Sequence, residues 1–127
     1  VGDHKLIDRI RQFRKHAGLM VPAPIQAAMI AALSDNDHAT AQAKRYSTRR
    51  DILSKAIRDA GLTIEHSTAG LYIWCTKNED CFKTVDWFAN LGILVTPGSF
   101  YGSDKFIRVA LTATDQQIQM AADRIIS

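Results

Sequence analysis

Arg108 is the residue of this sequence whose type and position point most directly to ligand chemistry. It lies in residues 106–111, where side chains alternate so that a strand places Arg108 on the face opposite Ile107 and Val109. A guanidinium within a sheet loses solvating water and requires an anionic partner. That partner is an internal Asp or Glu, or else a ligand carboxylate, which pairs two-to-two with the planar fork. An exposed position at a strand edge is the third alternative.

Other candidate groups show weaker signals. The loop 98–102 has two glycines and a hydroxyl, but no helix follows them to supply the free amides of a phosphate cradle, so a tight connection is the favoured interpretation. A Schiff base requires a desolvated lysine, and Lys55, like the others, falls in a solvated context. The two cysteines, Cys75 and Cys81, predict reduced thiols and a cytoplasmic protein. The four histidines show no metal spacing.

Composition predicts one soluble domain. The 127 residues are 46% hydrophobic and 23% charged, enough to close one core. No apolar run approaches the roughly 20 residues of a membrane span, and no leader pattern is present. The net charge of +3 is spread among mixed charges, which is a weak polyanion signal. The basic runs 9–15 and 44–50 are interpreted as solvated helix faces, with a subunit or phosphate contact as the alternative.

Hydrophobic periodicity predicts the elements that position Arg108. Three helices come first: one capped by Asp3 and stopped at Gly18, one opened by Pro22 and Pro24, and a long one from about 37 to 60. A strand covered on both faces (70–75), a helix (82–92), a buried strand (93–95), the strand 106–111 and a helix with the capping box Thr114–Gln117 follow. The predicted fold class is α/β, a layered small domain with long N-terminal helices packed on one small mixed β-sheet and two further helices.

Four motifs follow one another along the chain: Tyr46 with Arg49-Arg50-Asp51, residues 69–74, residues 92–102 and residues 106–111. Their order resembles the C-terminal part of class I and II aminotransferases, the fold-type I enzymes that depend on pyridoxal phosphate. The resemblance covers nearly the whole chain, and its specificity lies in the order and spacing of motifs that are individually loose.

The resemblance implies a role for each part of the chain. Residues 21–127 would be the small domain and residues 1–20 a connecting helix from a large domain that is absent here. The intact enzyme would transfer an amino group between an amino acid and a 2-oxo acid, with Arg108 binding the substrate α-carboxylate. It would be a cytoplasmic homodimer, in which residues 15–24 run close to the partner's active site.

The resemblance also implies what the chain leaves out. Residues 1–3 resemble the junction just after the family's cofactor lysine and phosphate-binding arginine, so both would lie upstream. The chain is therefore expected to be a fragment that is inactive alone and binds no pyridoxal phosphate. No catalytic, cofactor-binding or metal-binding residue is assigned within it. The expected partners are the amino-acid and 2-oxo-acid substrates, with no nucleic acid and no membrane.

The subfamily and two rival functions remain open. The segments RKHAGLMVP and APIQAAM resemble N-succinyldiaminopimelate aminotransferases of lysine biosynthesis. One rival is a non-catalytic regulatory domain that binds a small carboxylate through the same arginine. The other is an RNA-recognition-like module, which is disfavoured because its sheet needs exposed aromatic residues where this strand has Phe106, Arg108 and Ala110, and because three leading helices have no place in it.

Overall fold

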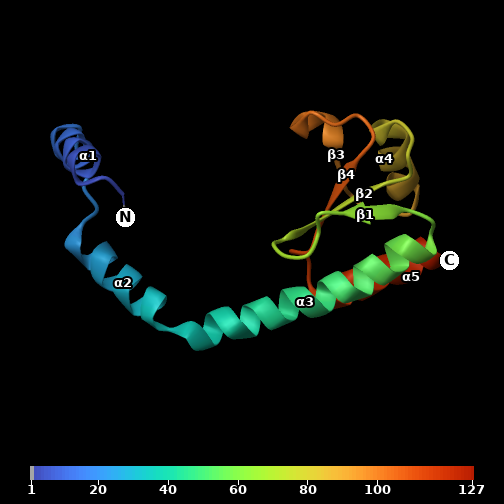
Figure 1. Cartoon of the computed structure of the whole chain (residues 1–127). Coiled ribbons are helices and arrows are strands. Elements are labelled where there is room, and N and C mark those ends of the chain that lie inside the picture. The colour runs from blue at the N-terminus through green and yellow to red at the C-terminus, as the bar shows by residue number, and fades with distance from the viewer. Residues whose placement is uncertain (1) are drawn as a thin grey trace. The chain divides into compact units, whose positions relative to one another are not determined.

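The computed structural model describes residues 2–127, which form five α-helices and a four-stranded sheet (Figure 1). They fall into two compact units, 2–39 and 40–127, and each is described by itself. The predicted division into residues 1–20 and 21–127 stays a prediction. Val1, the first residue of the predicted junction, lies outside the described residues.

The first unit consists of two helices whose ends follow the sequence signals. In α1 (His4–His16), Asp3 Oδ1 accepts a hydrogen bond from Leu6 N at 3.0 Å, as a helix cap does. Gly18, with φ +70°, follows the end of α1, and α2 (Ala23–Ser34) begins after Pro22 with Pro24 in its first turn. Neither helix has a buried residue, and the basic run 9–15 is exposed, as predicted.

The long helix α3 (Asn36–Asp59) is capped by Asp35, whose carboxylate accepts hydrogen bonds from the backbone of Asp37 and His38. The hydrogen bonds from His38 and Asp37 also lower the pKa of the Asp35 carboxyl. The predicted range of 37 to 60 is confirmed to within one residue at each end.

The second unit contains the sheet, and its α/β fold class is confirmed. The strands are β1 (Thr63–Glu65), β2 (Tyr72–Thr76), β3 (Thr96–Pro97) and β4 (Ile107–Ala110), in the order β1-β2-β4-β3. Every pairing is antiparallel, so the prediction of a mixed sheet is wrong. The reason is that β4 lies between β2 and β3, the two strands that α4 (Cys81–Asn90) connects, and runs antiparallel to both.

The predicted strand at 93–95 is wrong. Ile93 N instead donates to Phe88 O, which continues the end of α4 into a turn, and Leu94 is 96% exposed. Only Val95 of this segment is buried, and the strand pairing begins at Thr96. The local hydrophobicity therefore predicted a strand start at residue 93, three residues before the observed start at Thr96.

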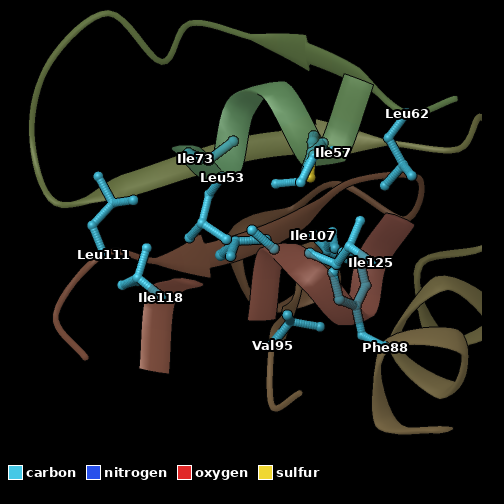
Figure 2. Packing of buried hydrophobic residues seen from close by; sticks show 14 of the residues in the cluster. Leu53, Ile57, Leu62, Ile73, Phe88, Val95, Ile107, Leu111, Ile118 and Ile125 are labelled. Atoms are coloured by element: carbon cyan, nitrogen blue, oxygen red, sulfur yellow. The ribbon is translucent and has the colours of Figure 1, made fainter. Parts of the chain in front are cut away.

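One face of the sheet forms the core with α3 and α5 (Asp115–Ile126) (Figure 2). Its buried side chains on β2 and β4 are Ile73, Cys75, Ile107 and Val109. They pack with Leu53 and Ile57 of α3, Phe88 of α4, and Ile118, Ala122 and Ile125 of α5. The expectation that the strand at 70–75 is covered on both faces is wrong for the described residues, because Tyr72 and its cross-strand neighbour Ala110 on the other face are exposed. We call the face with Tyr72, Trp74, Arg108 and Ala110 the open face.

The stability of the protein is expected to fall above about pH 9 through Cys75. Burial raises the pKa of this thiol to about 12. Between about pH 9 and pH 12 the unfolded chain has released this proton while the native state retains it, so the free energy of unfolding decreases as pH rises. Below about pH 9 the thiol is protonated in both states, and no stability is lost through Cys75. Urea denaturation from about pH 8 to 10.5 should cost the native sequence about 2 kcal/mol more than Cys75→Ala. Equal losses in the two proteins would contradict this assignment.

Candidate functional site

Arg108 lies in the middle of β4, opposite Trp74 of β2 and Thr96 of β3. Its neighbours Ile107 and Val109 are buried in the core, so the predicted alternation is confirmed and Arg108 belongs to the open face. Residues of one sheet face stand side by side across neighbouring strands. The guanidinium therefore lies among the side chains of Tyr72, Trp74 and Thr96.

The Arg108 guanidinium is held by one hydrogen bond and by aromatic rings. Nη2 donates to Thr96 Oγ1 at 3.2 Å. The carbon Cζ lies 4.3 Å from the centroid of the Tyr72 ring and 5.1 Å from that of Tyr101, within the range of cation–π attraction. The Nε atom is buried and has no hydrogen-bond partner among residues 2–127.

No carboxylate among residues 2–127 neutralises this guanidinium. The ion pairs within 4.0 Å in the described chain all involve other residues. An internal Asp or Glu was the simplest explanation for a mid-strand arginine. Because no described carboxylate pairs with Arg108, its positive charge is available to a ligand. A carboxylate approaching the free edge of the guanidinium would meet Nη1 and the second hydrogen of Nη2.

A hollow of about 470 Å³ opens beside Arg108 on the open face. Three aromatic side chains, Tyr72, Trp74 and Tyr101, line it together with Arg108, and residues 66–67 and 69–71 complete its wall. The lining is mostly apolar, with Arg108 as its fixed charge, so the hollow suits an organic anion better than a fully hydrated inorganic ion.

The wall at 69–71 is anchored from two sides. Arg50 of α3 donates from Nη2 to Gly70 O, and Leu111 N donates to Leu71 O at 2.9 Å. Gly70 has φ +80°, a conformation that glycine adopts without strain. The interpretation of Arg50 as part of a solvated helix face is wrong, because its side chain reaches the chain just before β2.

Arg49 also departs from the solvated-face interpretation. Its side chain is 11% exposed, Nε donates to Asp115 Oδ1 at 2.6 Å, and Nη1 donates to Leu111 O at 3.1 Å. The Tyr46 ring lies 5.6 Å from its Cζ. These contacts fasten α3 to the first turn of α5, so Arg49 has a structural role within the second unit.

The loop 98–102 forms a short 3-10 helix, η1 (Gly98–Tyr101), and confirms the predicted tight connection. Gly98 N donates to Phe106 O at 2.7 Å, and Ser103 N donates to Gly98 O at 3.1 Å. A Cβ at Gly98 would lie 2.3 Å from Phe106 O and 2.5 Å from Ser103 O. This close backbone approach fixes the position of Tyr101 next to Arg108.

No described lysine stands beside Arg108 where it could form a Schiff base with pyridoxal phosphate. No lysine lines the hollow. Lys77 is the one half-buried lysine among residues 2–127, and its Nζ lies 4.4 Å from the Trp87 ring centroid instead. Across residues 2–127 no three His, Cys, Asp or Glu side chains gather into a metal site. No described helix combines the length and apolar character of a membrane span.

Comparisons with known proteins agree on one family. Residues 1–125 match the family described as aminotransferase class I and II. The 4-dedimethylamino-4-oxo-anhydrotetracycline transaminase OxyQ of Streptomyces rimosus is 51% identical over 98% of this chain and 35% of its own length. The probable aminotransferase Rv1178 of Mycobacterium tuberculosis is 48% identical over 98% of this chain and 30% of its own length.

A solved structure gives the same answer for the fold. The structure of an aminotransferase from Staphylococcus aureus superimposes with a TM-score of 0.84 at 26% identity, over 99% of this chain and 35% of that chain. This chain thus spans about a third of the length of the relatives that it matches. Sequence motifs, fold and family match coincide over nearly all of its residues, and the chain belongs to the class I and II aminotransferases.

Proposed function

We propose that this chain binds the α-carboxylate of an amino-acid or 2-oxo-acid substrate through Arg108, as part of a pyridoxal-phosphate-dependent aminotransferase. One observation supports it above the others: the guanidinium faces an open hollow, and no described carboxylate lies within 4.0 Å of it. Family membership supports the amino-transfer reaction, in which both substrates carry a carboxylate next to the reacting carbon.

The physical role of Arg108 in this proposal is orientation. Two parallel hydrogen bonds from one guanidinium to one carboxylate fix both the position and the plane of that carboxylate. The neighbouring Cα–H bond then takes a defined direction, which lowers the entropic part of the barrier. Arg108 transfers no proton, and the steps that need the cofactor involve groups other than the described residues.

The experiment that tests this function follows a ¹⁵N-labelled amino group in the full-length protein that contains this chain, supplied with pyridoxal phosphate. We expect transfer from amino acids to 2-oxo acids and loss of transfer when the donor is the matching amino-acid amide, which lacks the carboxylate. A non-catalytic regulatory domain would bind the acid and transfer no label. Equal rates with the acid and the amide would contradict the role of Arg108.

The substrate is proposed more narrowly from the sequence segments that resemble N-succinyldiaminopimelate aminotransferases. This choice places the protein in lysine biosynthesis, while the relative OxyQ is named for a tetracycline intermediate. Including N-succinyldiaminopimelate in the labelled donor panel separates these substrates. We further propose that the intact enzyme is a homodimer, which its mass in solution would test.

A further inference from the structure

The Arg108 side chain lies against two tyrosine rings that come from different elements. Tyr72 belongs to β2, and Tyr101 is the last residue of η1. Their ring centroids lie 4.3 Å and 5.1 Å from Cζ of Arg108. Both tyrosines line the same hollow as the guanidinium. We call this pair of rings the tyrosine clamp.

Little else in the described chain fixes the guanidinium. Its hydrogen bond to Thr96 Oγ1 is 3.2 Å long, and its Nε has no partner. An arginine side chain has about 2 kcal/mol of rotamer entropy to lose when it is held in one orientation. Aromatic faces restrict the plane of a guanidinium while leaving its N–H edge free for a carboxylate.

The two rings of the clamp come from ordered elements, and Tyr101 is also packed against other aromatic side chains. Tyr101 meets Trp74 edge-on, with centroids 6.1 Å apart and planes at 80°, and Trp74 stacks on Phe106 at 5.3 Å and 3°. The backbone of Tyr72 is fixed by the sheet, where it pairs with Ala110 of β4. The clamp is therefore assembled from the sheet and from η1 before any ligand arrives.

We propose that Tyr72 and Tyr101 are positioning residues that preorganise the Arg108 guanidinium for the substrate carboxylate. This inference rests on the proposed function of Arg108. The ring faces do the positioning, so the hydroxyl groups are dispensable. Tyr72 and Tyr101 are 42% and 53% exposed, so neither ring is a core residue whose loss unfolds the protein.

The kinetic test uses the full-length enzyme with Tyr72→Leu, Tyr101→Leu and the double variant. Each single change should raise KM for the amino-acid donor about threefold to fivefold, and both together about tenfold or more, with a smaller change in kcat. Tyr72→Phe and Tyr101→Phe keep the rings and should stay within about twofold of the native KM. Phe100→Leu is the matched control, since Phe100 is in η1 but 73% exposed and outside the hollow.

A spectroscopic test needs no turnover. The Arg108 Nε–Hε resonance of the full-length protein should be shifted by the rings of the clamp, keep this shift in the Phe variants, and move toward its free value in the double Leu variant. An Arg108 Nε–Hε chemical shift that stays the same in the double Leu variant would overturn the proposed role of the clamp. So would an unchanged KM in the double Leu variant while Arg108→Gln impairs the enzyme. If Arg108→Gln itself leaves KM unchanged, the proposed function fails instead, and the resonance still reports on the clamp.

Discussion

Replacing Arg108 by glutamine is expected to lower kcat/KM for the amino-acid donor about a thousandfold, because about 4 kcal/mol of charge-assisted binding is lost. Glutamine retains much of the length of the side chain but has no charge and no fork. Arg108→Lys keeps the charge and loses the two-pronged geometry, so it should still lower kcat/KM about a hundredfold. Steady-state rates of the full-length enzyme measure both effects.

The matched control for these variants is Lys105→Gln, which removes one positive charge three residues away. Lys105 is exposed and does not line the hollow, so its loss should change kcat/KM less than about twofold. If Arg108→Gln also changed kcat/KM less than about twofold, another group would have to bind the substrate carboxylate.

The second large effect is expected at Gly98. Gly98→Ala should lower the free energy of unfolding by about 3 kcal/mol or more, because the added Cβ meets two backbone carbonyl oxygens at 2.3 and 2.5 Å. Neither carbonyl belongs to a flexible side chain, so the connection between β3 and β4 must shift. Urea denaturation of the full-length protein measures the change, and displacement of Tyr101 should raise KM in the protein that remains folded.

Gly102→Ala separates this clash from the general cost of replacing a glycine. Gly102 has φ +80°, and a Cβ there meets no atom within 4 Å, so its replacement should cost about 1 kcal/mol through backbone strain alone. Equal losses at Gly98 and Gly102 would show that the close approach of the backbone at Gly98 is unimportant.

The sequence predicts most of the local structure because its signals are local. Asp3, Asp35 and the pair Thr114–Gln117 cap the helices as their types and spacing require. The alternation of residues 106–111 correctly predicts which side of β4 faces the core. The fold class follows from the order of these elements.

The errors arise where distant atoms decide the outcome. Residues 93–95 have the composition of a strand, but the Phe88 carbonyl captures Ile93 N and turns the chain. Arg49 and Arg50 lie in a basic run typical of a solvated face, yet their partners Asp115, Leu111 and Gly70 lie 20 to 66 residues further along the chain. No periodicity within α3 reports on these contacts.

The aromatic part of the site was missed for the same reason. Tyr72 and Trp74 have the apolar character of buried strand residues, and Tyr101 lies in a loop that predicts only a turn. Their approach to Arg108 depends on the register between β2 and β4 and on the path of η1. The signal that the sequence did contain is the recurrence of aromatic residues before Arg108, at positions 72, 74, 101 and 106.

The most direct measurement of the central claim is a crystal structure of the full-length enzyme with an amino acid that lacks an α-hydrogen and therefore stays bound. We expect both oxygens of its carboxylate within about 3 Å of guanidinium nitrogens of Arg108, with Tyr72 and Tyr101 still against the guanidinium. A carboxylate bound to a different cation, with the Arg108 edge facing only solvent, would contradict the account.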